Sequence, residues 1–268
     1  MTDIGGCLVV VRGGGDLGSG VIWRLRRVGF PVVVLERERP LAIRRTVAFS
    51  SAVLEGRVTI DGIDGVLVGS PEEAIAATRR GVVPVLVSEV MPAFPVPVSV
   101  LVDARVAKQA LDTRVGQAPF VVALGPGFVT GVHCDAVVET KRGHDLGRVI
   151  RDGAAAPDTG IPGEIGGAAA ERVIHAPATG VLAWDVRFGD TVEAGQRLGR
   201  IDDTPVTAKI GGTVRGLIAP GEVTAGLKIA DVDPRPEPGM ITRISDKSLA
   251  VGGGVLEAIL AWLHDTGR

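Results

Sequence analysis

A glycine-rich turn between two apolar runs constrains the fold of this chain more than any other feature. The run at 7–12 has the composition of a strand that is buried on both faces of a parallel sheet. Residues 13–20 are rich in glycine, and apolar residues at helical spacing follow over 21–28. A second apolar run begins at residue 32 and ends at Glu36. The order of strand, glycine turn, helix, strand and acid predicts a βαβ unit.

The glycine turn has the residue types that the phosphate of a nucleotide requires. In the pattern G-x-G-x-x-G, Gly13 permits a sharp turn, Gly15 lets a pyrophosphate approach the backbone, and Gly18 lets the helix pack on the strand. The N–H groups at the helix N-terminus, around Asp16, then face the phosphate. Glu36 lies 18 residues after Gly18 and is able to accept hydrogen bonds from ribose hydroxyls. We predict that these five residues bind a cofactor.

The identity of the nucleotide stays open at this point. Glu36 favours NAD, whereas an excess of arginine after it would neutralise the 2′-phosphate of NADP. The arginines concerned are Arg37, Arg39, Arg44 and Arg45. The alternative is that the glycines make only a tight turn and that the arginines form a solvated face. The complete βαβ context favours nucleotide binding.

Strands and short helices alternate through the middle of the chain. Apolar runs predict strands at 66–68, 82–87, 98–103 and 119–124, and helical patterns occupy 71–80 and 104–111. Strands that alternate with helices predict a doubly wound parallel sheet. We therefore expect residues 1–155 to form a Rossmann-like nucleotide-binding domain, so the fold class is α/β.

A second glycine turn follows the apolar run at 119–124 and contains Gly125 and Gly127. In an open α/β sheet, ligands bind outside the carboxyl ends of the strands. We therefore add both glycines to the residues that are predicted to bind the cofactor.

Reactive side chains are concentrated just beyond this second turn. Cys134 is a candidate nucleophile or sulfur carrier if a nearby cation lowers its pKa. Glu139 and His144 are candidates for proton transfer, and Arg142 is a candidate for binding a phosphate or carboxylate. The alternative is that Cys134 is a small buried hydrophobe and that the charges are solvated. No Cys-x-x-Cys pair is present, so we expect no zinc site and no other metal.

The stretch at 151–170 is rich in Gly, Ala and Pro, and this composition predicts a linker between domains. An internal repeat follows, in which Gly180 corresponds to Gly212 and Gly189 to Gly221, each with an offset of 32 residues. Each half predicts short strands that are separated by glycine turns, and two such halves form a compact β domain.

This repeat, over residues 172–235, resembles the biotinyl/lipoyl-like barrel-sandwich hybrid fold. Carrier proteins of that fold present a lysine on the hairpin between the halves. The corresponding turn at 201–206 has no lysine, and the nearby Lys209 falls at a strand position. We therefore expect a docking or structural role for this domain rather than a carrier role.

The last segment, 244–268, predicts a helix from about 255 to 264 that returns to the first domain. The glycines at 252–254 would form a turn at its N-terminus, where they either bind an anion or serve as a flexible cap.

Composition excludes several classes of function. The net charge is −2, so no basic excess is present to attract nucleic acid or an anionic membrane. The first residues lack the pattern of a signal peptide, and no run has the composition of a membrane-spanning helix. Two cysteines, Cys7 and Cys134, do not make a disulfide framework. We expect a cytoplasmic protein with reduced thiols.

The chain resembles the YqeB family in motifs that are spread over nearly its whole length: VRGGGDLGSGV, AIRRTVAFSSAV, LGPGF, CDAVVETKRGHDLGRVI, TGIPG, DVDPR and SDKSLAVGGGVLEAIL. The resemblance implies an accessory component of the selenium-dependent molybdenum hydroxylase system. The Rossmann half is more distantly similar to XdhC proteins, which help to mature xanthine dehydrogenase by handling the sulfuration of its molybdenum cofactor. The resemblance implies a maturation role and assigns no catalytic residue.

Three hypotheses follow. The first is an accessory protein that binds the molybdenum cofactor, as a pterin or as a dinucleotide, and helps to load a client molybdenum hydroxylase with sulfur or selenium. In this hypothesis Cys134 relays the sulfur or selenium, and the β domain docks the client. The second is an NAD(P)-dependent oxidoreductase, and the third is a nucleotide-sensing module without chemistry. Whether a reaction is catalysed, which client is served, and whether identical chains form a homo-oligomer stay open.

Overall fold

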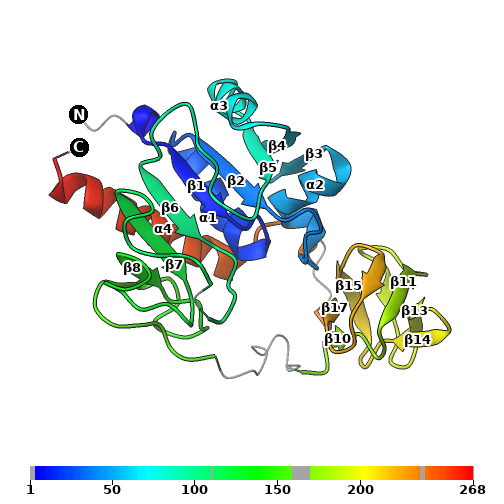
Figure 1. The fold of residues 1–268 in the computed structure, drawn as a ribbon. Coiled ribbons are helices and arrows are strands. Elements are labelled where there is room, and N and C mark those ends of the chain that lie inside the picture. Colours follow the sequence, from blue (N-terminus) through cyan, green and yellow to red (C-terminus); the bar gives the residue numbers. More distant parts are fainter. Residues whose placement is uncertain (1–3, 110, 159–169, 236–238, 268) are drawn as a thin grey trace. The chain divides into compact units, whose positions relative to one another are not determined.

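The computed structural model describes residues 4–109, 111–158, 170–235 and 239–267, which form two units (Figure 1). Unit 1 takes its residues from 1–40, 47–158 and 244–268, and unit 2 takes its residues from 41–46 and 159–243. The chain therefore passes from unit 1 into unit 2 twice.

A nine-stranded sheet forms the centre of unit 1, in the order β3-β4-β5-β2-β1-β6-β7-β8-β9. Its strands are β1 (Val9–Arg12), β2 (Val32–Glu36), β3 (Arg57–Ile60), β4 (Ile63–Val68), β5 (Val83–Val87), β6 (Val100–Asp103), β7 (Phe120–Leu124), β8 (Ala136–Val138) and β9 (Val149–Ile150). Neighbouring strands are parallel except in the pairs β3–β4 and β8–β9. The prediction of a mixed α/β fold that contains a large parallel sheet is confirmed.

The order of the strands reverses at β1, which lies between β2 and β6. From β1 the chain builds one side of the sheet through β2 to β5, and it then returns to β6 and builds the other side. The carboxyl ends of β1 and β6 therefore lie at the switch point of the strand order, which is where open α/β sheets bind ligands.

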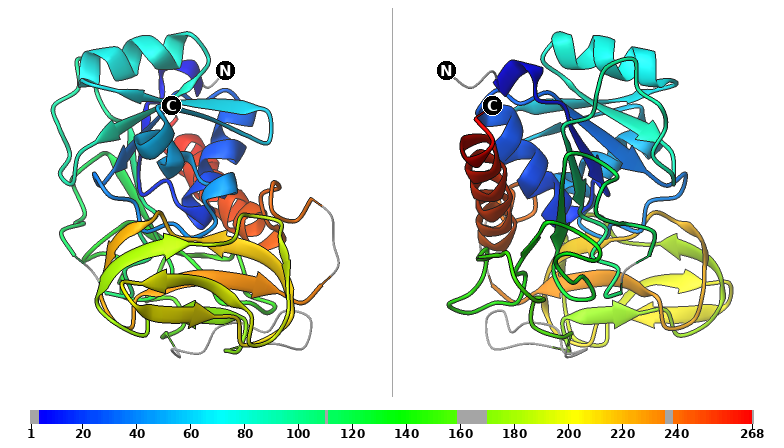
Figure 2. Two further views of the ribbon diagram at one scale, coloured as in Figure 1. Left: turned by 90° about the vertical axis from the view of Figure 1, so that its right-hand side faces the viewer. Right: turned by 60° about the vertical axis from the view of Figure 1, so that its left-hand side comes forward.

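Helices cover both faces of the sheet (Figure 2). They are α1 (Asp16–Arg27), α2 (Ala52–Glu55), α3 (Pro71–Arg79) and α4 (Asp246–Asp265), with short 3-10 turns η1 (Ile4–Gly6), η2 (Arg45–Val47) and η3 (Phe49–Ser51). Side chains alternate along each strand, so Val9 and Val11 pack in the same core as α1 and α4, whereas Val10 packs in the core that includes α3.

The helix expected over 104–111 does not form in the described residues of that stretch. Val106 and Lys108 have positive φ angles of 51° and 65°, and an α-helix excludes such angles. The segment instead carries Arg105, which forms an ion pair with Asp103 at the end of β6. Helix α4, from the end of the chain, contacts β7, β8 and β9 and covers this part of the sheet.

Helix α4 begins at Asp246, well before the expected start near residue 255. The side chain of Ser245 caps it by accepting the Ser248 N–H. The glycines at 252–254 lie inside the helix, so they form neither a turn nor an anion site at its N-terminus.

These glycines are tolerated because two of them permit close backbone contact. A Cβ on Gly252 would lie 2.4 Å from the Gly20 carbonyl oxygen of α1, and a Cβ on Gly254 would lie 2.1 Å from the Gly147 carbonyl oxygen. On the α1 side, a Cβ on Gly20 would lie 2.1 Å from the Ser248 carbonyl oxygen. The two helices therefore pack with almost no side-chain layer between them.

Unit 2 consists of two four-stranded antiparallel sheets, in the orders β10-β17-β15-β12 and β14-β13-β11-β16. The strands are β10 (Val173–His175), β11 (Gly180–Trp184), β12 (Thr191–Val192), β13 (Arg197–Ile201), β14 (Thr204–Thr207), β15 (Gly212–Leu217), β16 (Gly221–Val223) and β17 (Lys228–Asp233). Each sheet takes two strands from each half of the sequence repeat. The hairpin between the halves, β13–β14, turns at Asp202 and Asp203.

Neighbouring glycines of α4 provide a matched test of its packing. Gly252→Ala is expected to destabilise unit 1 by about 1–3 kcal/mol, because the added Cβ overpacks the contact with α1. Gly253→Ala has open space around the new Cβ and is expected to leave stability unchanged or to raise it by up to about 1 kcal/mol through helix propensity. Urea unfolding followed by tryptophan fluorescence measures both; equal effects of the two changes would contradict the packing.

Candidate functional site

The glycine turn after β1 is closely packed on one side and open on the other. Gly13 has a φ of +96°, and a Cβ on Gly18 would lie 2.1 Å from the Gly13 carbonyl oxygen. Only glycine therefore lets α1 start this close to the strand. Gly15, the N-cap of α1, has no described atom within 4 Å of the position that a Cβ would take. A ligand can approach the backbone at Gly15, next to the first N–H groups of α1, which have no intrahelical acceptor.

The structure brings Glu36 to the same turn. Its Oε2 accepts the N–H of Gly14 at 2.9 Å, and its Oε1 accepts the N–H of Arg37 at 3.0 Å. Burial raises the pKa of the Glu36 carboxyl, and the two backbone hydrogen bonds and the charge of Arg37 act in the opposite direction. Each carboxylate oxygen keeps acceptor capacity for a ligand hydroxyl beside the turn.

The segment η3 supports the turn from outside the βαβ unit. Ser50 donates its N–H to the Gly14 carbonyl oxygen at 2.9 Å. The hydroxyl of Ser19 donates to the same oxygen at 3.0 Å and accepts the Phe49 N–H at 2.9 Å. The sequence analysis missed this support, because only the family motif AFSSAV marks these residues.

A partly buried ionic cluster occupies the switch point, at the carboxyl ends of β1 and β6. Arg12 ends β1 and contacts Asp112 at 2.6 Å, while Asp103 ends β6 and contacts Arg105 at 2.6 Å. Arg105 also contacts Asp112 at 2.8 Å, and the hydroxyl of Thr113 donates to Asp103 at 2.5 Å. Arg12 and Asp103 are buried, and Asp112 is half exposed.

This cluster changes the titration of Asp112. Partial burial alone would raise the pKa of its carboxyl, but hydrogen bonds from Arg12 and Arg105 and the charges of the two arginines lower that pKa to about 2. The sequence analysis missed the cluster, although a charged residue at the end of each apolar run, Arg12 and Asp103, was a signal for it.

Asp16 links the turn to the last helix. Its Oδ1 accepts the hydroxyl hydrogen of Ser248 at 2.7 Å, and Ser248 lies in the first turn of α4. The N-termini of α1 and α4 therefore meet next to the glycine turn.

The second glycine turn is packed rather than open. Gly125 and Gly127 have φ angles of +75° and +94°. A Cβ on Gly125 would lie 2.5 Å from Oγ1 of Thr140, and a Cβ on Gly127 would lie 2.5 Å from the backbone nitrogen of Gln109. Both glycines therefore admit protein atoms where the sequence analysis expected a ligand.

Glu139 organises a loop instead of facing a substrate. Its side chain is buried, and it accepts the backbone N–H groups of Thr140, Lys141 and Ala156, each at 2.7 Å. Because three donors surround the carboxylate, the structure gives it no access for proton transfer.

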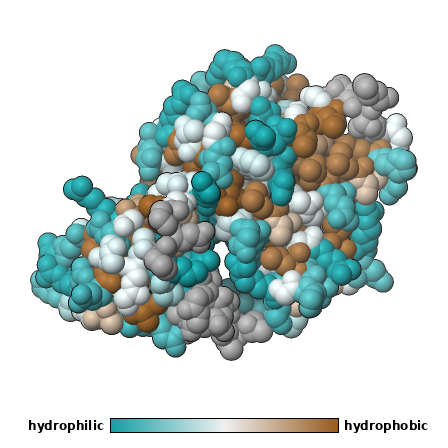
Figure 3. Space-filling view, turned by 180° about the vertical axis from the view of Figure 1, so that it is seen from behind, coloured by the Kyte–Doolittle hydropathy of each residue, from teal (hydrophilic) through white to brown (hydrophobic). Residues whose placement is uncertain are grey.

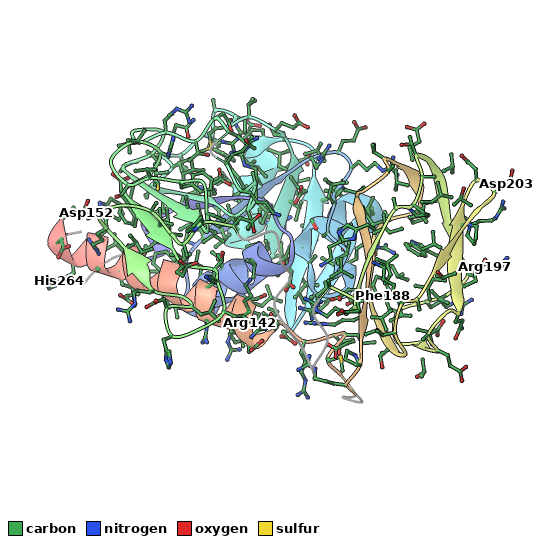
Figure 4. The ribbon with its side chains drawn as sticks, turned by 90° about the horizontal axis from the view of Figure 1, so that it is seen from below. Arg142, Asp152, Phe188, Arg197, Asp203 and His264 are labelled. Atoms are coloured by element: carbon green, nitrogen blue, oxygen red, sulfur yellow. The ribbon has the colours of Figure 1, made fainter. Side chains whose placement is uncertain are left out.

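Arg142 and His144 lie in the exposed loop that Glu139 organises. The guanidinium of Arg142 donates to both carboxylate oxygens of Asp246, at 2.8 and 3.0 Å, and so ties the loop to the start of α4 (Figure 4). His144 is exposed to solvent. The loop follows β8, at the same edge of the sheet as the glycine turn but three strands away from β1.

Cys134 does not share a core with the helix that follows the glycine turn. It precedes β8 at the amino edge of the parallel strands, and it packs in the core that includes α3, on the face opposite to α1. The thiol is fully buried, and burial, together with the charges of Asp135 and Asp103, raises its pKa to about 12. A nucleophile or sulfur carrier needs an accessible thiolate, so the structure argues against that role for Cys134.

The structure thus brings together one group of the predicted residues and separates it from the rest. Gly13, Gly15, Asp16, Gly18 and Glu36 surround one turn at the switch point. Glu139, His144 and Arg142 share another loop, and Cys134 lies on the other face. Among the described residues, no group of His, Cys, Asp and Glu side chains is arranged to hold a metal ion.

The chain is 47% identical over 265 residues to the "Uncharacterized protein YqeB" of Escherichia coli (strain K12). The match covers 96% of this chain and 48% of that protein, so the chain spans about half the length of the curated relative it matches. The resemblance to the YqeB family is therefore confirmed. No protein-family profile matches the chain.

Solved structures show only weak likeness to this chain. A succinylglutamate desuccinylase/aspartoacylase from Rhodobacter sphaeroides has 26% identity and a TM-score of 0.23, and it covers 25% of this chain and 24% of its own. The ectoine utilization protein EutE from Ruegeria pomeroyi has 12% identity and a TM-score of 0.25, with coverage of 85% and 57%. An aspartoacylase family protein from Mesorhizobium loti has 11% identity and a TM-score of 0.27, with coverage of 86% and 86%.

Across the part of the chain that the structure describes, no helix has both the length and the apolar character that crossing a bilayer requires.

Asp112 predicts a pH-dependent contribution to stability. Its pKa is lowered in the folded state to about 2, so its stabilising effect is present above about pH 4 and is lost as the pH falls through about 2. Because the side chain is half exposed, we expect Asp112→Asn to cost about 1 kcal/mol at pH 7 and almost nothing near pH 2. Urea unfolding at several pH values measures the difference. Asp145→Asn, at an exposed ion pair with Arg148, is the control.

Cys134 is predicted to be inert towards thiol reagents in the folded protein. With a pKa of about 12, roughly one thiol in ten thousand is ionised at pH 8, and burial blocks access as well. An aromatic disulfide reagent at pH 8 should therefore label Cys134 only after the protein is unfolded in urea. Rapid labelling of Cys134 in native protein, identified by mass spectrometry, would restore it as a candidate nucleophile.

Proposed function

We propose that this protein binds a nucleotide-containing ligand at the glycine turn of unit 1 and serves as an accessory protein in the maturation of a molybdenum hydroxylase. The ligand is NAD(P) or the molybdenum cofactor in a dinucleotide form. Unit 1 acts in this proposal as a Rossmann-like nucleotide-binding domain. Unit 2 acts as a barrel-sandwich hybrid without a carrier lysine, and it docks the client enzyme.

The proposal rests on one observation: the residues of the glycine turn differ in how closely protein atoms pack against them. Gly18 is packed so that α1 begins directly behind β1, Gly15 is open to an approaching group, and Glu36 is held beside them. A pyrophosphate would lie against the N–H groups at the start of α1, and the carboxylate of Glu36 would accept from a ribose hydroxyl. The maturation role rests on the resemblance to the YqeB family.

The ionic cluster next to the turn supports recognition by backbone groups. Arg12 is paired with Asp112, and Arg105 is paired with both Asp103 and Asp112, so the charges of the two arginines are largely neutralised at the switch point. The phosphate would therefore be held by helix N–H groups and by the field of α1 rather than by a cationic side chain. Such a site favours a ligand that also offers hydroxyls to Glu36, which a ribose does and a free phosphate does not.

The burial of both thiols limits which step of maturation this protein is able to perform. The chain has only Cys7 and Cys134, and both are buried. We therefore propose that it holds and delivers the cofactor, and that a sulfur or selenium atom is not carried on either of its thiols.

Gly15→Val tests the site directly. Because a Cβ at Gly15 meets no described atom, the variant is expected to fold with a loss of stability of at most about 1 kcal/mol. The larger side chain should block the approach of a pyrophosphate and lower nucleotide affinity by at least about tenfold, which corresponds to about 1.4 kcal/mol. Isothermal titration calorimetry with NAD⁺, NADP⁺, GDP and CDP measures the binding, and Gly253→Val, which also adds a side chain at an open position, is the matched control.

A measurement in cells separates binding from maturation. Molybdenum hydroxylase activity in a strain that lacks this gene should be restored by the natural chain and by Cys134→Ala, and should not be restored by Gly15→Val. Absence of binding to all four nucleotides, with normal maturation by Gly15→Val, would overturn the proposal. If the protein binds a nucleotide tightly but its loss does not change molybdenum hydroxylase activity, the maturation role is wrong. The protein would then be a nucleotide-binding protein that serves a different client.

A further inference from the structure

The outward side of α4 is apolar where a surface helix normally carries charge. Leu249, Gly253, Leu256 and Leu260, called here the α4 face, follow one another at helical spacing along the side that is not buried. Leu260 is 41% exposed, and Leu249 and Leu256 are only partly buried. Because the opposite side of α4 packs on α1 and on the sheet, the helix is apolar nearly all round. Such a helix is normally covered on every side.

The pictures show that α4 lies on the outside of unit 1. In the view from below, α4 lies along the outside of unit 1 beside α1 (Figure 4), and both helices pack in the same core of the sheet. In the view from behind, apolar surface is gathered in one broad area on this side of unit 1 (Figure 3). Val28, the C-cap residue of α1, is a further apolar side chain with 45% exposure.

The shape of the α4 face also suits a close contact. Gly253 has no described atom within 4 Å of the position of a Cβ, so it leaves a shallow notch between Leu249 and Leu256. A backbone or a small side chain of a second helix fits such a notch, in the way that Gly252 already admits α1 on the other side. Glu257 is the exposed charge next to this stripe, so the rim is polar on one side.

The length of the curated relative indicates what covers this face. The match to YqeB includes 96% of this chain but only 48% of the relative, so in that protein a second portion of similar length is joined to the counterpart of this chain. A covalent link keeps such a portion at high effective concentration, which lets an apolar contact form without high intrinsic affinity.

We propose that the α4 face is the docking surface for the polypeptide that corresponds to the half of YqeB outside the match. The contact is apolar, with Leu256 and Leu260 as its anchors and Gly253 as the point of closest approach.

Cysteine labelling tests the proposal with both proteins intact. Leu260→Cys is introduced into this chain, and a cysteine is introduced at the aligned position of full-length Escherichia coli YqeB. The two native thiols of this chain are buried, so a maleimide reports on the new cysteine. The control is Val181→Cys on β11 of unit 2, which is 54% exposed, and the aligned position of YqeB.

Labelling of the Leu260→Cys position is expected to be at least about tenfold slower in full-length YqeB than in this chain, while the control position labels at similar rates in both. Circular dichroism confirms that each variant is folded. Equal labelling of the two proteins at this position would overturn the proposal, because the face would then be uncovered in the relative. A second outcome would also overturn the proposal: slow labelling of Leu260→Cys in this chain, at a rate that falls as the protein concentration rises. That result would mean that a second copy of this chain covers the α4 face.

Discussion

Close backbone contact that only glycine permits is the constraint on which unit 1 depends. At Gly18 it lets α1 start directly behind β1, and at Gly20 and Gly252 it lets α4 lie against α1 without a layer of side chains. Gly254 extends the same contact to the loop before β9. The position of α1 relative to the sheet, the cover over β7 to β9, and the meeting of two helix N-termini all follow from these contacts. A methyl group at Gly20, Gly252 or Gly254 would push apart elements that are distant in the sequence.

Electrostatics at the switch point determine what kind of ligand fits there. The two arginines at the switch point are neutralised by two aspartates, and the carboxylate of Glu36 is held against the turn. What remains for an anion is a set of oriented backbone N–H groups, and what remains for a hydroxyl is an oriented carboxylate. This combination matches a nucleoside phosphate better than an isolated anion, and it explains why the proposed function is built on the turn rather than on the charged loop.

The burial of both thiols changes the chemistry that the protein is expected to perform. Sulfur transfer through a cysteine requires a thiolate that partners reach, whereas Cys134 is enclosed by apolar neighbours and keeps its proton. Holding a cofactor at one end of the sheet, while an apolar helix and a separate β unit remain available for partners, is a role that needs no reactive side chain. Glu139 fixes a loop, and Arg142 ties that loop to the start of α4.

The sequence by itself determined the βαβ start, the parallel sheet and the internal repeat of the β unit, because these depend on local patterns: apolar runs, glycine spacing and a constant offset. It also identified the turn at which we propose that a ligand binds. Tertiary structure alone decided the rest. Positive φ angles at Val106 and Lys108 removed a helix that periodicity favoured, and packing against Gly20 and Gly147 kept glycines 252–254 inside a helix. The face of the sheet that holds Cys134, and the pairing of Arg12 with Asp112, depend on long-range contacts that no local pattern encodes.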